Sequence, residues 1–513
     1  MSILRSAATV SAFTMLSRVT GLIRDMLIAR YFGVCAATDA FYVAFRIPNL
    51  LRRLFAEGAF SQAFVPMLSQ VKEKESPSRT EEFINHVFTL LALAVFLASV
   101  LGVLSAPAVV WVIATGFAET PTTFDLAVAL TRFMFPYIIF MSLVALAAAV
   151  LNTWRHFAIP AFTPVLLNVS FIVFIVFVSE HLDAPVWALP FAVLVGGVLQ
   201  LATQLVQLKR MRLMPRFASV KSAVRDKAVT KLLRLMVPAI VGVAVAPISI
   251  LINTNIASRL IEGSVTWLSY ADRLMEFPTA LLGSVLLPSL SRAYARGDTG
   301  AYQDLLDTGL KVVFLLAVPA AVGLGFLAEG LSSVLFQGKN FTALDVAQTS
   351  VAVRGYAVGM IGLIGIKIIA PAFYARKDIK TPMIVAILSV VFIQSLNIVT
   401  VPLFAHAGLA ISVALGSCFN ALVLLAVLAK RTWYTPVDGW VRYITRTLVA
   451  AGAMALFLSW IQTGTDWVAM QNAWEIRLVY ILGIIGSAAL VYFALLWLLG
   501  WRAQELKHAA RQN

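Results

Sequence analysis

Stretches of about twenty apolar residues follow one another along almost the whole of this 513-residue chain. A helix of about 20 residues is long enough to cross the roughly 30 Å hydrocarbon layer of a membrane. The composition agrees, since 60% of the residues are hydrophobic and 13% are charged, whereas about a quarter of the residues of a soluble protein are charged. The sequence therefore predicts an all-α polytopic membrane protein.

The breaks between the apolar stretches, at Pro, Gly and charged residues, predict about fourteen transmembrane helices. They lie at about 7–32, 37–68, 83–105, 126–151, 161–179, 186–208, 231–259, 265–292, 305–328, 344–375, 382–402, 407–429, 444–463 and 475–500. The second span is the least apolar of them because it carries many charges.

Lysine and arginine are concentrated in alternate connectors between these spans. One set of connectors holds Lys72, Lys74, Arg79, Arg155, the run from Lys209 to Lys231, Arg292, Arg296, Arg376, Lys377, Lys380, Lys430, Arg431, Arg442 and Arg446. The other set carries only Arg259 and Lys339. Because Lys-rich and Arg-rich connectors face the cytoplasm, we expect both termini to be cytoplasmic. This topology accounts for the net charge of +15, so no nucleic-acid partner is expected.

Two pairs of prolines indicate an internal repeat. Pro66 and Pro288 end the second and eighth spans, and Pro160 and Pro382 follow the fourth and tenth; both pairs are separated by 222 residues (288 − 66 and 382 − 160). Transporters are commonly built from such repeats. The spacing predicts two parallel six-helix lobes around a central cationic cavity, which would work by alternating access, plus two additional C-terminal helices.

The predicted domains follow from this repeat. They are an N-terminal lobe at 1–208, a basic cytoplasmic linker and hinge at 209–230, a C-terminal lobe at 231–430, and the additional helices with a cytoplasmic tail at 431–513. The additional helices could either pack against a lobe or form a groove for a lipid tail.

Charged residues at membrane depth are the strongest functional signal, because each costs about 3 kcal/mol or more unless it is paired or lines a polar cavity. They gather on the first, second and eighth spans. The candidate substrate-binding residues are Arg18, Arg24, Asp25, Asp39, Arg52, Arg53, Arg273 and Glu276. Arginine dominates this set, and its guanidinium binds phosphate through paired hydrogen bonds. We therefore expect an anionic substrate, such as a phosphate or diphosphate, which could be soluble or lipid-linked.

Other chemistry has little support in the sequence. None of the five histidines forms a metal-ligand spacing with cysteine or a carboxylate, and no Gly-rich loop precedes a Lys-Ser/Thr pair. We expect neither an enzyme nor a metal site nor a cofactor. Isolated cations are expected to reach the headgroups from the ends of their helices; these are Arg30, Arg132, Arg354 and Lys367.

Several segments resemble the MurJ (MviN) family of lipid II flippases. They are Ser17–Asp25, Ala37–Pro66, Leu151–Trp154, Tyr270–Pro278 and Asp378–Pro382, of which the second is the most specific. The resemblance covers essentially the whole chain. It implies membership of the MOP exporter superfamily, with two six-helix lobes and two extra helices that form a lipid-facing groove.

The resemblance also implies a substrate and a place in the cell. The family moves lipid II, an undecaprenyl-diphosphate disaccharide-pentapeptide, from the cytoplasmic to the periplasmic leaflet of the bacterial inner membrane, for peptidoglycan synthesis and cell shape. Its important cavity positions fall on Arg18, Arg24, Asp25, Asp39, Arg52 and Arg273. Arginines would clamp the diphosphate, and carboxylates would orient them. Expected partners are lipid II, membrane lipids and the cell-wall synthesis machinery.

The energy source is open at this level. Some members of the family use an Asp on the seventh helix to bind sodium, and Ile248–Asn255 contains no acid here. Membrane potential or a proton gradient is therefore an equal candidate, and the potential would supply about 2.3 kcal/mol per charge per 100 mV. Two other functions stay open: a flippase for another prenyl-diphosphate-linked glycan, and a drug/cation antiporter of the same superfamily, which would need an acidic cavity.

Overall fold

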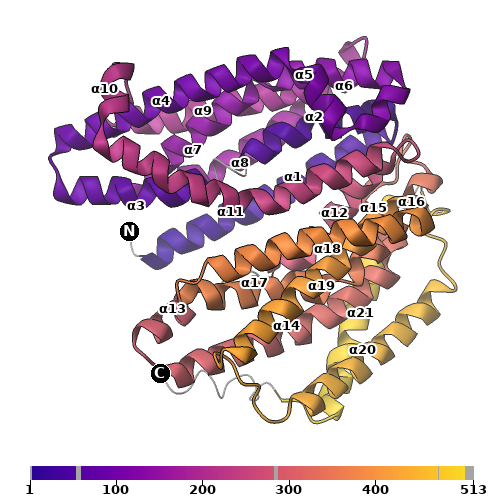
Figure 1. Cartoon of the computed structure of the whole chain (residues 1–513). Helices are drawn as coiled ribbons and strands as arrows, with labels where there is room; N and C mark the ends of the chain where they lie inside the picture. The colour runs from indigo at the N-terminus through magenta and orange to yellow at the C-terminus, as the bar shows by residue number, and fades with distance from the viewer. Residues whose placement is uncertain (1–2, 53–58, 282–286, 472, 503–513) are drawn as a thin grey trace. The chain divides into compact units, whose positions relative to one another are not determined.

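The computed structural model describes residues 3–52, 59–281, 287–471 and 473–502, and these residues form helices and connecting turns without a strand (Figure 1). The all-α prediction is confirmed. The chain divides into two compact units, Met1–Thr266 and Trp267–Asn513.

The described residues of the first unit form eleven α-helices and the beginning of a twelfth. They are α1 (Ile3–Phe32), α2 (Ala36–Arg52), α3 (Ala59–Lys74), α4 (Pro77–Leu104), α5 (Ala106–Ile113), α6 (Pro121–Met134), α7 (Tyr137–Thr153), α8 (Ala158–Val173), α9 (Ala188–Arg210), α10 (Val220–Arg225), α11 (Lys227–Ser258) and the start of α12 (Ser264–Leu281). Short 3₁₀ and π segments join them at η2 (Thr115–Glu119), η3 (Phe174–Val178), η4 (Ser179–His181) and η5 (Pro185–Trp187).

The described residues of the second unit continue α12 and form nine more helices. They are α13 (Leu287–Ala295), α14 (Thr299–Phe326), α15 (Ala328–Phe336), α16 (Ala343–Ala357), α17 (Met360–Ala375), α18 (Lys380–Phe404), α19 (His406–Lys430), α20 (Trp440–Gln462) and α21 (Trp474–Leu498).

Many of these helices can cross a membrane. Within the described ranges nine candidate spans are long and apolar enough, one of which (Pro121–Thr153) joins α6 and α7; there are ten if α16 and α17, bent by 46°, count as one broken span. The chain is thus a multi-pass membrane protein, while the count of fourteen stays a prediction. The predicted second span includes α2, with 17 residues, and α3, with 16; residues 53–58 between them lie outside the described ranges.

The boundary between the two compact units lies at another position than the boundaries of the predicted lobes. The predicted linker at 209–230 includes the end of α9, all of α10 and the start of α11, and the whole of α11 lies in the first unit. The lobe and linker boundaries given by the sequence stay a prediction.

The internal repeat is visible in where the helices begin. The helices α4, α5, α6 and α8 start at 77, 106, 121 and 158, and α14, α15, α16 and α18 each start 222 residues later, at 299, 328, 343 and 380. The backbone repeats as well, because Arg155 (φ 61°) and Lys377 (φ 62°) are both non-glycine residues with positive φ. The offset seen in the prolines therefore extends over whole helices and the turns that follow them.

One contact of the repeat is preserved with its partners exchanged. In the first unit Lys72 Nζ lies 4.3 Å from the ring centroid of Trp154. In the second unit Arg376 Cζ lies 5.3 Å from the ring centroid of Tyr294. Positions 72 and 294, like 154 and 376, are 222 residues apart. Both units thus place a cation against a ring at the same two positions, but the cation and the ring have changed places.

The additional C-terminal helices pack tightly into the second unit. A buried apolar cluster joins α20 and α21 to α14 and α15, and the Tyr492 hydroxyl donates to the Leu315 carbonyl at 2.8 Å. Arg477, 1% exposed, donates to Ser333 Oγ at 2.7 Å and Gln337 Oε1 at 2.6 Å. These contacts give the pair a packing role, and a lipid-tail groove stays a prediction.

Exchanging the partners in the first unit tests whether the contact itself stabilises the fold. Lys72→Tyr and Trp154→Arg should each destabilise the protein, while the double variant should recover about 0.5–1 kcal/mol, because a cation would again face a ring. The measurement is a double-mutant cycle on thermal unfolding in detergent. If the effects of the two single substitutions simply add, the contact between positions 72 and 154 does not stabilise the fold.

Candidate functional site

Arg24 and Asp25, two of the predicted substrate-binding residues, form a buried pair on α1. Arg24 Nε and Nη2 each lie 2.8 Å from Asp25 Oδ1. Arg24 Nη1 also donates to Asn168 Oδ1 on α8 at 3.1 Å. The Arg24 side chain is 13% exposed and that of Asp25 is 7% exposed. A guanidinium is thus held in a fixed orientation within the helical bundle of the first unit.

Asn168 is a site residue that the sequence reasoning missed. Its amide nitrogen donates to the Ser17 carbonyl at 3.0 Å and to Thr20 Oγ1 at 3.1 Å, while its oxygen accepts from Arg24. Asn168 also packs over Gly21, where a Cβ would lie 3.5 Å from Asn168 Nδ2, an ordinary van der Waals contact. The sequence signal for Asn168 was its amide side chain within a largely apolar helix, because a buried amide requires hydrogen-bond partners.

Asp39 has a different environment. Its Oδ2 accepts from the Gly263 amide at 2.7 Å. Its Oδ1 accepts from the Thr266 amide at 2.9 Å and the Thr266 hydroxyl at 2.6 Å. With Asp39 only 3% exposed, this carboxylate satisfies the free amides at the start of α12 and complements the positive end of that helix.

The capping is reciprocal. Glu262 Oε1 accepts from the Ala36 amide at the start of α2 at 2.7 Å, so each of these two helix starts is held by a carboxylate from the neighbouring segment. Thr38 Oγ1 also accepts from the Cys35 amide at 3.0 Å. The sequence placed Asp39 in the candidate site but indicated no helix for it to cap, because Asp39 and Gly263 are separated by 224 positions in the chain.

Arg273 and Glu276 form a second ion pair, on α12 in the second unit. Arg273 Nη1 lies 2.9 Å from Glu276 Oε2, and the two side chains are 34% and 49% exposed. Their spacing of three residues places them on one face of the helix. This pair is more open than Arg24 and Asp25.

Three predicted residues remain, namely Arg18, Arg52 and Arg53. Arg18 is exposed on α1. Arg52 is the last residue of α2, and Arg53 lies outside the described residues. The structure therefore brings Arg24 together with Asp25, and Arg273 with Glu276, while Asp39 is occupied by the start of α12.

In the predicted seventh span, the side chain of Asn255 is paired with neighbouring segments. Asn255 Nδ2 on α11 donates to the Val112 carbonyl at 2.8 Å, and Asn255 Oδ1 accepts from Thr115 Oγ1 at 3.2 Å. Nowhere among the described residues do three or more His, Cys, Asp or Glu side chains form a group that could hold a metal ion.

Comparison with known proteins identifies the family. The family model described as lipid II flippase MurJ matches residues 28–477. The chain is 48% identical over 516 residues, covering 100% of both chains, to a Burkholderia cenocepacia protein named lipid II flippase MurJ. The chain belongs to the MurJ family. Its relatives are named as flippases, that is, as transporters rather than catalysts.

Solved structures agree on the fold. A lipid II flippase MurJ in an inward closed conformation is similar with a TM-score of 0.79 at 23% identity, over 94% of this chain and 98% of that one. An inward-facing multidrug resistance MATE family transporter of the MOP superfamily is similar with a TM-score of 0.66 at 13% identity, over 83% of this chain and 98% of that one. The resemblance to the MurJ family is confirmed, and the fold is shared with these solved structures.

Removing the Asp39 carboxylate should destabilise the start of α12. Asp39→Ala leaves three buried donors without their acceptor, at a cost of about 1–3 kcal/mol for each one that water cannot reach. Thermal unfolding of the purified protein in detergent measures the loss. Asp39→Asn, which retains one acceptor oxygen, is the matched control and should lose less. Equal stability of wild type and Asp39→Ala would contradict the capping role.

Proposed function

We propose that this protein flips lipid II from the cytoplasmic to the periplasmic leaflet of the bacterial inner membrane by alternating access, with both termini in the cytoplasm. The observation that carries the proposal is the 48% identity over the full length to a protein named lipid II flippase. The fixed guanidinium of Arg24 supports it, because lipid II presents a diphosphate.

Arg24 is the central ligand in this proposal. A guanidinium offers paired donors that match phosphate oxygens, and it stays charged when water is excluded. Asp25 and Asn168 fix its orientation, so little side-chain entropy is lost when the diphosphate binds. The ring of Phe171, with its centroid 5.3 Å from Arg24 Cζ, further restricts the guanidinium.

The other predicted residues would add positive charge for the diphosphate and a contact that forms again after transport. Arg18, Arg52, Arg53 and Arg273 would complete the cationic surface for the diphosphate, with Glu276 orienting Arg273. Asp25 and Asp39 would act as relocking partners after the substrate leaves; for Asp39, the contact with the start of α12 is the one that would form again.

We propose that the membrane potential or an ion gradient drives transport, without a cofactor. An anionic headgroup that moves outward across an inside-negative membrane gains about 2.3 kcal/mol per charge per 100 mV if it crosses the full potential. The expected partners are lipid II, membrane lipids and the cell-wall synthesis machinery. A different prenyl-diphosphate-linked glycan would satisfy the same arginines.

The deciding experiment measures lipid II on the outer face of cells depleted of this protein. Wild type, Arg24→Ala or Arg273→Ala is then expressed at matched membrane abundance. We expect wild type to restore surface lipid II and both variants to reduce it at least tenfold, because a lost charge-assisted contact costs about 1.5–3 kcal/mol. Arg132→Ala is the control, since Arg132 is exposed near the end of α6.

Three results would contradict parts of the proposal. Surface lipid II that persists after depletion, in cells without a second flippase, would point to another prenyl-linked glycan. Normal transport by Arg24→Ala and Arg273→Ala would contradict the proposed binding of the diphosphate by these arginines. An equal loss in Arg132→Ala would show that any arginine on these helices matters equally.

A further inference from the structure

The connector between α9 and α11 is bound along the surface of α4. The Arg216 amide donates to Asn85 Oδ1 at 2.7 Å, and the Ala218 amide donates to Thr89 Oγ1 at 2.9 Å. We call residues 211–226 the strap. Its backbone amides are paired with α4 side chains one turn apart, so the strap follows the helix instead of spanning open solvent.

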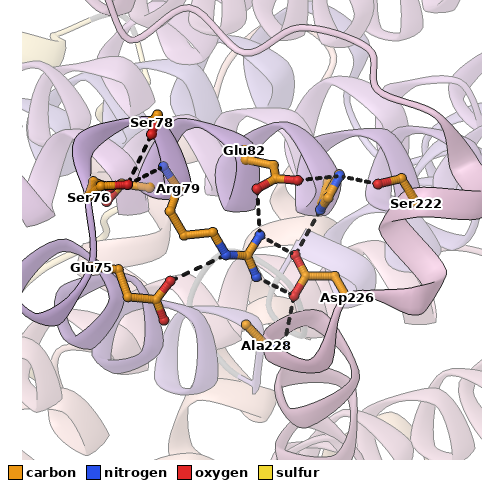
Figure 2. Close-up of polar contacts among 10 residues, drawn as sticks. Glu75, Ser76, Ser78, Arg79, Glu82, Ser222, Asp226 and Ala228 are labelled. Atoms are coloured by element: carbon orange, nitrogen blue, oxygen red, sulfur yellow. Dashed lines mark hydrogen bonds and ion pairs between the residues drawn. The ribbon is translucent and has the colours of Figure 1, made fainter.

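The strap ends at Asp226, which binds four donors (Figure 2). Arg79 approaches its carboxylate with both terminal nitrogens, at 2.9 and 2.7 Å. His86 Nδ1 lies 2.8 Å from Oδ2, and the Ala228 amide donates to Oδ1 at 2.9 Å. One side chain thus caps α11 and fastens its start to α4.

The electrostatics favour a permanent carboxylate at this position. Burial alone would raise the pKa of Asp226, but the hydrogen bonds from Arg79, His86 and the Ala228 amide lower that pKa well below its usual range. Arg79 is itself held by Glu75 at 3.3 Å and Glu82 at 3.0 Å. The contact is therefore charged and oriented throughout the neutral pH range.

Asp226, His86 and Ser222 are linked in the same order as the residues of a hydrolase triad, but their role here is structural. Asp226 contacts His86 Nδ1, and His86 Nε2 lies 3.1 Å from Ser222 Oγ. In a working triad the aspartate stabilises the charged imidazole. Here the two bonds from Arg79 already neutralise Asp226, so the chain of bonds holds the strap in place.

The other end of α11 is also fixed within the first unit. Besides the bond from Asn255 to Val112, the Gly116 amide donates to Ser258 Oγ at 3.2 Å. A Cβ at Gly116 would lie 2.0 Å from the Ser258 carbonyl oxygen, so the backbones touch. A 32-residue helix is therefore tied to the first unit at its beginning and its end.

We propose that Arg79, His86 and Asp226 are positioning residues for transport, because they fix the start of α11 on α4 while the opposite end is fixed by η2. This proposal rests on the proposed flippase function. Helix α11 can change its position only with the first unit or by breaking this contact. The contact therefore determines how α11 moves during the transport cycle.

Two substitutions of Asp226 separate its charge from its capping role. Asp226→Asn retains an oxygen that can cap the Ala228 amide but loses the charge that binds Arg79. Asp226→Glu retains the charge and is a poorer cap. We expect transport per molecule to fall at least fivefold in Asp226→Asn and in Arg79→Gln, and Asp226→Glu to retain most of it even if its melting temperature falls further.

The matched control is Asp298→Asn. Asp298 caps α14 by accepting from the Ala301 amide at 2.8 Å, is exposed, and forms no ion pair with another described residue. Surface lipid II in depleted cells is measured at matched abundance. Separately, trypsin is applied to the purified full-length protein in detergent, where the strap presents Lys221 and Arg225. Cleavage there should accelerate at least fivefold in Asp226→Asn and Arg79→Gln but not in the control.

The outcomes are distinct. Faster cleavage together with reduced transport supports the proposal. Faster cleavage with unchanged transport, or transport that follows melting temperature across all variants, would show that the contact only stabilises the fold. Either result would overturn the proposal. Unchanged cleavage would refute the fastening itself. If wild type fails to restore surface lipid II, the proposed function is wrong, while the cleavage result still decides whether Asp226 fastens the strap.

Discussion

The energetic cost of a charge that is removed from water determines where the polar groups of this protein lie. In a chain with so few charged residues, each one on an apolar helix needs a partner, and the partners are specific. Arg24 has a carboxylate and an amide, Asp39 has the start of a helix, and Arg477 has the neutral oxygens of Ser333 and Gln337. These pairings fix how neighbouring helices meet, because a helix that shifted along its axis would leave a buried charge unsatisfied. Packing of apolar side chains then fills the space between such fixed points.

Much of the architecture was predictable because it depends on properties that a single sequence displays. Apolar stretches of sufficient length predicted membrane helices, and the two proline pairs predicted a repeat that extends to the beginnings of four helix pairs. The candidate charges on α1 and α12 were found by the same reasoning, since Arg24 and Arg273 interrupt apolar segments. These features are local, or they recur at a constant spacing, and both kinds of pattern can be seen without a structure.

The contacts that were not predicted join residues far apart in the chain. Asn168 lies 144 residues from Arg24, and neither residue indicates the other. Asp39 was recognised as a charge in an apolar region, but the sequence could not show that it faces the unpaired amides before α12. The strap was described as a basic linker because composition reports its charges; the pairing of its backbone amides with Asn85 and Thr89 depends on a helix more than 120 residues earlier.

The exchanged cation and ring within the two repeats affect how this duplication is recognised. At positions 72 and 294, and again at 154 and 376, a comparison of the two halves by residue identity records two mismatches. Taken as pairs, the same positions record one preserved interaction. Scoring compensating pairs across the two halves would therefore count this interaction as shared, whereas a residue-by-residue alignment counts it as lost.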